Sequence, residues 1–291
     1  MQQVVNGIFS GSIYALFAIG FALVFGVLDR LNLAHSAVFA AAAFVGIDLV
    51  GSVGVPVWLA LPLVLVFGAV LGLVIERVAF RPLKNRNDAH FAGLISSIAV
   101  GTMILALVQA RYGPGTRRFP VDTFPSTAFT VGGVRITLLQ LVILGVSLAL
   151  MLGLAYVVER TRLGRGMRAV AENPHAARVL GINVDRVTAT TFAISSALGA
   201  VAGVLLSFYV NSAQLSMGFN IELKGLAVIV VGGMASLRGA MVGGIALGLA
   251  EVFAVAYIGS SWRDAVAFGL LFAVLLIRPQ GLFGAPRVRE V

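Results

Sequence analysis

The sequence has no cysteine, few charged residues and only two lysines. The absence of cysteine excludes disulfide bonds, thiol catalysis and thiolate metal sites. Charged residues make up 11% of the 291 residues, against roughly 25% in soluble domains. Both lysines, Lys84 and Lys224, follow leucine, so the chain lacks the Gly-rich loop ending in Gly-Lys-Ser/Thr that holds nucleotide phosphates. The chain is therefore not expected to bind ATP through that motif.

Groups for catalysis are also scarce. The three histidines, His35, His90 and His175, lie in separate segments and show no metal-binding spacing. Ser195 and Ser196 fall in an apolar run with no base nearby in the sequence. We expect no catalytic residue, no metal site and no cofactor bound by this chain. The net charge of +9 is distributed over loops between apolar runs, which indicates membrane topology and not a nucleic-acid partner.

Long apolar runs are what the sequence has in abundance. Hydrophobic residues are 59% of the chain and the mean hydropathy is +1.00. Runs of about 20 residues, the length that crosses a bilayer, recur throughout the chain. The predicted spans lie near residues 4–28, 37–51, 57–75, 91–110, 137–158, 187–209, 224–236, 239–258 and 263–278.

These runs set the predicted fold class. The first run has no charge before Asp29 and is too long for a signal peptide, so it reads as a membrane span. The runs 37–51 and 224–236 are short. We predict an all-α, polytopic helical membrane protein, one domain over 1–291, with about 8–10 transmembrane helices of which one or two are short or interrupted.

The basic residues predict the orientation of the chain in the membrane. With the N-terminus outside and the C-terminus in the cytoplasm, the inner loops hold 15 of the 21 lysines and arginines. Four of the six on the outer side fall in one segment, residues 111–136. That segment ends in AFTVGGVRIT, two β-prone runs around Gly132-Gly133, which predicts a hairpin. Whether it docks a partner or only connects two spans is left open.

Two breaks interrupt the apolar pattern, at residues 26–36 and 232–244. Interrupted helices often lie near substrate in transporters, whereas ordinary tight turns explain the same residues equally well. Glycine pairs four residues apart occur about as often as chance predicts, so they do not by themselves predict helix contacts. The candidate translocation-path residues from the breaks are Asn32, His35, Ser36, Gly232, Gly233 and Ser236.

Glu251 is the one acid well inside a predicted span, and it joins these candidates. Its structural interpretation is a charge neutralised by Lys224 or Arg263; its functional interpretation is contact with a passing substrate. A single buried acid is thin support for ion coupling. An ion-coupled secondary carrier therefore remains an alternative.

A basic segment, residues 159–186, separates two apolar runs and contains six arginines. Within it, Asn173 is placed to cap a helix, Pro174 to start it and Gly181 to end it. This predicts a helix over Pro174–Leu180, too short to be stable alone. Its apolar face suits the groove of a protein partner, and its arginines suit an anionic lipid surface. The residues alone do not decide between the two.

Four separated motifs resemble the membrane-spanning permease subunits of bacterial branched-chain amino acid ABC importers. They are NGIFSGSIYALFAIGFALVFGVLDRLNLAHS (6–36), RAVAENPHAARVLGIN (168–183), GLAVIVVGGMASLRGAMVGG (225–244) and IRPQGLFG (277–284). The resemblance implies a multi-pass protein of the inner membrane. It also implies two ATPase subunits that use ATP and Mg²⁺, a second, related permease chain and a periplasmic substrate-binding protein.

The resemblance further implies that 159–186 is a cytoplasmic coupling loop and Pro174–Leu180 its coupling helix. The residues carried over to ATPase coupling are Glu172, Asn173, Pro174, His175, Ala176, Ala177 and Gly181. Ala176 and Ala177 would allow close approach to the ATPase groove. The wider importers carry an EAAxxxG loop, and here His175 stands in place of its glutamate.

The expected activity is import of branched-chain or related neutral amino acids by alternating access driven by the ATPases. Permeases that this chain resembles also handle urea and short amides, which gives an alternative substrate class. No residue in the sequence separates these substrates, because in such importers selection lies largely with the binding protein.

Overall fold

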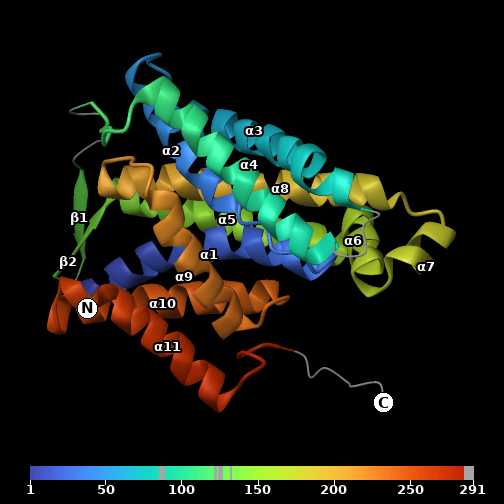
Figure 1. The fold of residues 1–291 in the computed structure, drawn as a ribbon. Coiled ribbons are helices and arrows are strands. Elements are labelled where there is room, and N and C mark those ends of the chain that lie inside the picture. Colours follow the sequence, from blue (N-terminus) through green and yellow to red (C-terminus); the bar gives the residue numbers. More distant parts are fainter. Residues whose placement is uncertain (85–88, 121–122, 124–126, 132, 285–291) are drawn as a thin grey trace.

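The computed structural model describes residues 1–84, 89–120, 123, 127–131 and 133–284, and these are almost entirely helical (Figure 1). The long helices run side by side and the only described strands form one small hairpin. The helices are α1 (Gln2–Leu28), α2 (His35–Gly51), α3 (Val57–Ile75), α4 (Ala89–Tyr112), α5 (Leu138–Arg160), α6 (Arg162–Glu172), α7 (Pro174–Val179), α8 (Val184–Val210), α9 (Met217–Gly232), α10 (Leu237–Tyr257) and α11 (Arg263–Ile277). The strands are β1 (Ala128–Val131) and β2 (Val134–Thr137), and the shorter helices are η1 (Glu76–Phe80), η2 (Arg81–Leu83) and η3 (Ser260–Trp262).

The predicted fold class is confirmed. In the described part of the chain, seven helices are long and apolar enough to cross a membrane. The short run predicted at 37–51 is α2, an apolar helix of 17 residues. It is buried along most of its length between α3, α4, α8 and α9. Because its neighbours shield it from lipid, α2 does not need the length of a lipid-facing span.

Three predicted boundaries were wrong. Residues 76–83, expected as a loop, continue α3 as a π-helical turn and a 3₁₀ turn. The span expected at 224–236 is α9, which begins earlier at Met217 and ends at Gly232. The basic segment 159–186 holds a second helix, α6, in addition to the short one predicted. In each case the helix extends through polar residues that the hydropathy pattern places outside a span.

Small residues allow the central helices to pack closely. α1 and α8 are buried on nearly all sides, and α1 lies along α10. At that crossing Gly11 meets Gly248, and Gly244 meets Ala15, where an added side chain would collide with backbone. The glycine pairs that the sequence left uninterpreted therefore lie at a helix contact.

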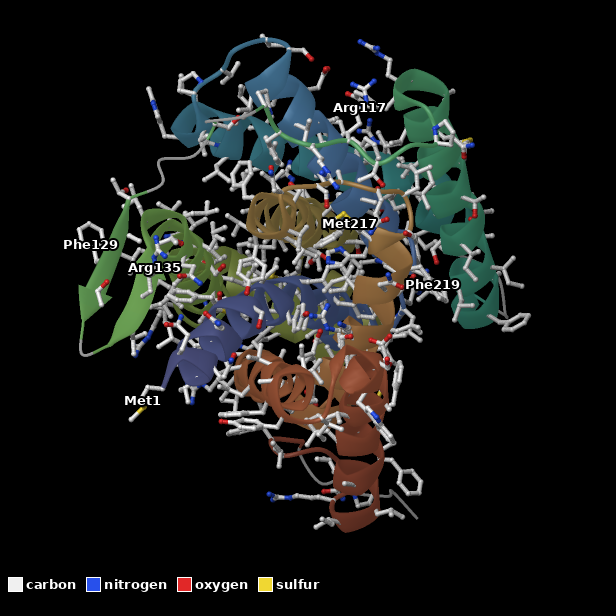
Figure 2. The ribbon with its side chains drawn as sticks, turned by 90° about the vertical axis from the view of Figure 1, so that its left-hand side faces the viewer. Met1, Arg117, Phe129, Arg135, Met217 and Phe219 are labelled. Atoms are coloured by element: carbon white, nitrogen blue, oxygen red, sulfur yellow. The ribbon has the colours of Figure 1, made fainter. Side chains whose placement is uncertain are left out.

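The two ends of the helix bundle differ. At the hairpin end, β1 pairs with β2 in the predicted antiparallel hairpin, and Gln2 at the start of α1 donates to and accepts from the backbone of Arg135. Figure 2 views this end, with Met1 beside the hairpin residues Phe129 and Arg135. Gly132 lies outside the described residues. α6 and α7 occupy the opposite end, called here the α7 end.

The segment after α11 folds back to the end of α9. The amides of Leu282 and Phe283 donate to the carbonyls of Val231 and Gly232, at 2.8 and 3.0 Å. These carbonyls belong to the last turn of α9 and have no partner within the helix. The returning segment therefore caps α9 at the α7 end.

Candidate functional site

α7 is a short helix that protrudes at the α7 end and is fixed by caps at both of its ends. The side-chain oxygen of Asn173 accepts hydrogen bonds from the amides of His175 and Ala176, at 2.9 and 3.0 Å. Pro174 occupies the first helical position. Gly181 has a φ of 83°, the left-handed conformation that ends many helices. The predicted helix over Pro174–Leu180 is confirmed, with Leu180 as its final cap residue.

The surface of α7 is apolar at its tip. Val179 and Leu180 are 77% and 79% exposed, which is unusual for two neighbouring large aliphatic side chains outside the lipid-facing helices. Ala176, His175 and Glu172 are exposed as well. Ala177 is only 1% exposed and belongs to the core. It therefore does not lie on the outward face, where the family resemblance implied that it would.

α6 connects α7 to the bundle. It is amphipathic, and its buried side chains Met167 and Val170 face α1 and α8. Its first turn is capped by Thr161, whose hydroxyl accepts from the amide of Gly164 at 3.2 Å. α6 therefore joins α7 to α1, α5 and α8.

The three candidate residues of the first predicted break, Asn32, His35 and Ser36, are buried. Asn32 is 2% exposed, and neither of its side-chain polar atoms has a hydrogen-bond partner among the described residues. His35 is fully buried, with its Nε2 3.3 Å from the carbonyl oxygen of Phe17. Ser36 donates to the Glu222 carboxylate at 2.9 Å, which joins the start of α2 to α9.

The second predicted break forms a tight turn at the same end of the molecule as the first. Gly232 packs against the backbone of Gly239, and Gly233 has a φ of 105° that ends α9. The hydroxyl of Ser236 caps α10 by accepting from the amide of Gly239 at 3.0 Å. These contacts match the tight-turn interpretation of Gly232, Gly233 and Ser236. Whether they also line a translocation path stays a prediction.

Glu251 lies in a polar chamber of about 260 Å³ at the hairpin end, called here the hairpin-end chamber. It is 3% exposed, and its Oε1 lies 2.8 Å from the Lys224 ammonium and 2.9 Å from the Arg263 guanidinium. Lys224 also lies 5.2 Å from the centre of the Tyr14 ring. The predicted neutralisation of Glu251 by these two cations is therefore what the geometry shows.

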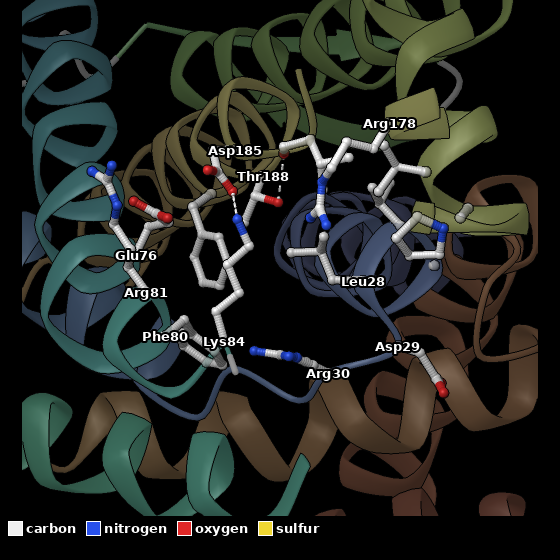
Figure 3. A pocket seen from close by; sticks show the side chains of 17 residues that line it. Leu28, Asp29, Arg30, Glu76, Phe80, Arg81, Lys84, Arg178, Asp185 and Thr188 are labelled. Atoms are coloured by element: carbon white, nitrogen blue, oxygen red, sulfur yellow. Dashed lines mark hydrogen bonds and ion pairs between the residues drawn. The ribbon is translucent and has the colours of Figure 1, made fainter. Parts of the chain in front are cut away.

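A second cavity, of about 400 Å³, lies behind α7 at the opposite end (Figure 3). It is called here the α7-end cavity, and sequence reasoning missed it. Four separate segments form its walls: the end of α1 with the following loop, the η1–η2 turns, α6–α7 and the start of α8. Among its lining residues are Arg30, Glu76, Lys84, Arg178 and Asp185. No group of histidine and acidic residues able to hold a metal ion occurs in the described part of the chain.

The family of the chain follows from its similarity to known proteins. A profile of the family described as "Branched-chain amino acid transport system / permease component" matches residues 3–275. The high-affinity branched-chain amino acid transport system permease protein BraD of Pseudomonas aeruginosa is 37% identical, covering 100% of this chain and 98% of BraD. The chain belongs to this permease family. It is a multi-pass membrane protein.

Further relatives extend the comparison. LivH of Escherichia coli K12, a high-affinity branched-chain amino acid transport system permease protein, is 36% identical over 100% of the permease and 97% of LivH. The ribose import permease protein RbsC of Haemophilus influenzae is 26% identical over 82% of the permease and 71% of RbsC. Among solved structures, PsaBC from Streptococcus pneumoniae in complex with Fab matches 97% of the permease and 94% of that chain, with a TM-score of 0.52. At 11% identity this last likeness concerns the fold alone.

Proposed function

We propose that this permease is the membrane-spanning subunit of an ATP-driven importer of branched-chain or related neutral amino acids in the bacterial inner membrane. The observation that carries the proposal is the exposed apolar tip of α7, Val179 and Leu180, on a helix capped at both ends. The full-length similarity to BraD and LivH, whose names describe branched-chain amino acid transport, supports the substrate class. The same similarity favours it over urea or short amides.

The proposed orientation puts the α7 end in the cytoplasm and the N-terminus outside. The basic residues of 159–186, together with Arg30, Arg81 and Lys84, lie toward this end, in agreement with the positive-inside rule. The C-terminus then lies in the cytoplasm as well. The hairpin end faces the periplasm, where a substrate-binding protein delivers its ligand.

The proposed partners follow from what the permease lacks. It has no phosphate-binding loop, so ATP and Mg²⁺ are used by two separate ATPase subunits. A second permease chain, related but not identical, completes the pathway. The exposed apolar side chains of α3, α4, α5 and α11 suit contact with that chain and with membrane lipid.

In the proposed mechanism, α7 transmits the movement of the ATPase to the permease. Val179 and Leu180 enter a groove on the ATPase, burying apolar surface as an amphipathic helix does in a peptide groove. Ala177 anchors α7 to the permease core from the opposite face. When ATP binding closes the ATPase pair, α7 moves, and α6 transmits the movement to α1 and α8. These helices then open the pathway to the other side.

The alternative from another class, an ion-coupled secondary carrier, needs a carboxylate that exchanges protons or cations. Glu251 is held by two cations at once, so it is poorly suited to that role. Uptake that persists without an ATPase subunit and collapses with the proton gradient would favour the carrier.

The test replaces one residue at the tip of α7. Leu180→Asp places a charge in the ATPase groove, and we expect ATP-dependent uptake to fall at least tenfold because a buried, unpaired charge costs well over 1.4 kcal/mol. Uptake is measured in proteoliposomes that contain the whole complex. The matched control, Leu180→Met, keeps apolar surface at the same position and should transport like the wild type.

The readouts separate coupling from folding. We expect the Leu180→Asp permease to be present in the membrane at wild-type amounts but to lose co-purification with the ATPase. Ala177→Asp would not separate the two, because Ala177 is buried. Normal ATP-driven uptake by Leu180→Asp would refute the assignment of α7.

A further inference from the structure

The α7-end cavity lies between α7 and the ends of α1, α3 and α8. Pro174 and Arg178 of α7 form one wall, and Arg30 after α1 and Glu76 at the end of α3 line others. Its volume of about 400 Å³ falls in the range of small-molecule sites. A ligand in this cavity would touch the coupling helix and the core helices together.

Positive charge in the cavity is only partly neutralised. Lys84 pairs with Asp185. Arg30 and Arg178 have no ion pair within 4 Å among the described residues, although both line the cavity. In Figure 3 the guanidinium of Arg178 points toward the middle of the cavity, and that of Arg30 extends toward Lys84. Burial lowers the pKa of the Arg30 guanidinium, a cost that a bound anion would offset. Arg81 also lines the cavity without an ion pair, so three of its four lining cations are unpaired among the described residues.

Negative charge in the cavity comes from Asp29, Glu76 and Asp185. Asp185 pairs with Lys84, and Glu76 lies on a different wall from Arg30 and Arg178. Glu76 is 5% exposed, and no hydrogen bond or ion pair holds its carboxylate among the described residues. Its carboxylate oxygens are not themselves fully buried, so they are open to the cavity. Glu76 also lies in the π-helical turn η1, and such turns occur frequently at functional sites. A cationic group bound in the cavity would supply the missing partner.

Apolar side chains fill the walls between these charges. Phe80, Val170 and Phe192 line the cavity, and Phe80 lies against Phe192 with ring centres 4.7 Å apart. A ligand for such a cavity carries an anionic group, a cationic group and a small apolar side chain. Neither a simple phosphate nor a simple amine uses all three features.

We propose that the α7-end cavity binds a free apolar α-amino acid from the cytoplasm and that this binding slows transport. The carboxylate lies against Arg30 and Arg178, the ammonium group against Glu76, and the side chain against Phe80 and Val170. This inference rests on the proposed function, because it takes the α7 end as cytoplasmic and α7 as the coupling helix. The ligand belongs to the same chemical class as the transported substrate, so the site limits import when product accumulates.

The inhibition arises because the bound amino acid connects α7 to the other walls of the cavity. A bound amino acid connects Arg178 on α7 to Arg30 and Glu76 on the core side of the cavity. It stabilises the arrangement in which the cavity is formed and has no affinity for one in which α7 has moved away. Differential affinity of this kind is what shifts a conformational equilibrium.

The experiment uses proteoliposomes with the full complex, ATP inside and the binding protein with labelled leucine outside. Unlabelled leucine at graded concentrations is loaded in the lumen, which corresponds to the cytoplasm. We expect the initial rate of ATP-dependent uptake to fall several-fold as luminal leucine rises. The Glu76→Gln and Arg30→Gln permeases should transport normally at zero luminal leucine. Each should need at least about tenfold more leucine for the same inhibition, since each loses a charge-assisted contact.

Control compounds and a control variant test the chemistry of the site. 4-Methylpentanoate, which lacks the ammonium group, should inhibit the wild type less than leucine and should not distinguish it from Glu76→Gln. Glu159→Gln removes an acid at the same end of the permease that pairs with Arg238 outside the cavity. It should leave inhibition by luminal leucine unchanged.

The outcomes distinguish the two proposals. If uptake at zero luminal leucine does not depend on ATP, the proposed function fails. ATP-dependent uptake that luminal leucine does not reduce would leave the function intact and overturn the inference. Uptake that responds to the fraction of phosphatidylglycerol in the vesicles, and not to leucine, would assign the cavity to a lipid phosphate and also overturn it. Inhibition unchanged in both Glu76→Gln and Arg30→Gln would do the same.

Discussion

The two cavities of the permease differ in whether their buried acid is paired with cations. In the hairpin-end chamber, Glu251 has two cations within 3 Å. In the α7-end cavity, Glu76 and Arg30 are both removed from solvent to a large degree, and neither has an ion pair among the described residues. Charges that are already paired hold helices together. Charges left without partners are available to a ligand.

The comparison explains why one buried acid is structural and another is a candidate for binding. Glu251 on α10 pairs with Lys224 on α9 and with Arg263 on α11, so its ion pairs connect three helices at the hairpin end. Glu76 makes no ion pair among the described residues and lies where α3 passes into the π-helical turn η1. Substitutions at the two sites should therefore differ first of all in how they change the free energy of unfolding.

The largest expected effect is at Glu251. Glu251→Gln leaves Lys224 and Arg263 close together without their carboxylate, and removing one partner of a buried pair is strongly destabilising. We expect a loss of about 3 kcal/mol in the free energy of unfolding. Unfolding of the purified permease in detergent, followed by intrinsic fluorescence, measures this change.

The control for Glu251→Gln is a second ion pair at the opposite end. Glu159 and Arg238 lie 2.8 Å apart but are 46% and 74% exposed, so Glu159→Gln should cost less than about 1 kcal/mol. Adding Lys224→Gln to Glu251→Gln removes one uncompensated cation and should restore about 1 kcal/mol of the loss. Equal losses for Glu251→Gln and Glu159→Gln would contradict the structural role of Glu251.

An intermediate effect is expected at the cap of α7. Asn173→Ala removes the side-chain oxygen that accepts from His175 and Ala176, at a cost of about 1 kcal/mol. We expect this cost to appear locally, as faster hydrogen exchange over residues 174–182. Asn173→Asp retains a capping oxygen and should exchange as slowly as the wild type. A uniform change across the permease would mean that α7 is not an independent element.

The smallest effect on stability is expected at Glu76. Glu76→Gln breaks no ion pair or hydrogen bond in the described part of the chain, so the free energy of unfolding should stay within about 0.5 kcal/mol of the wild type. The detergent unfolding used for Glu251→Gln gives a direct comparison. A loss as large as that of Glu251→Gln would show that Glu76 is already paired and would remove the contrast between the two cavities.

Much of the fold could be predicted from the sequence because membrane spans are a matter of local hydropathy. The hairpin was predicted correctly from Gly132-Gly133, and α7 from Asn173, Pro174 and Gly181, because turns and caps are also local. α9 was misplaced because Glu222 and Lys224 lie inside the helix. Glu222 accepts a hydrogen bond from Ser36 and Lys224 donates one to Glu251, contacts with other helices that a local pattern does not reveal.

The site was predicted less completely, for the same reason. The sequence identified α7, but which of its small residues faces outward depends on how α6 and α8 hold it, and Ala177 proved to be buried. The α7-end cavity draws its residues from four segments between Gly26 and Phe192. No spacing along the chain brings Arg30, Glu76 and Arg178 together. Their juxtaposition exists only in the folded permease.

The returning segment after α11 is synthesised later than the helix that it caps. The last carbonyls of α9 accept hydrogen bonds from Leu282 and Phe283, which the ribosome adds only after α10 and α11 have been made. Until then the inner end of α9 lacks its cap. α9 carries Glu222 and Lys224, the groups that join it to α2 and α10. The cap of α9 therefore forms only after α10 and α11 have been synthesised.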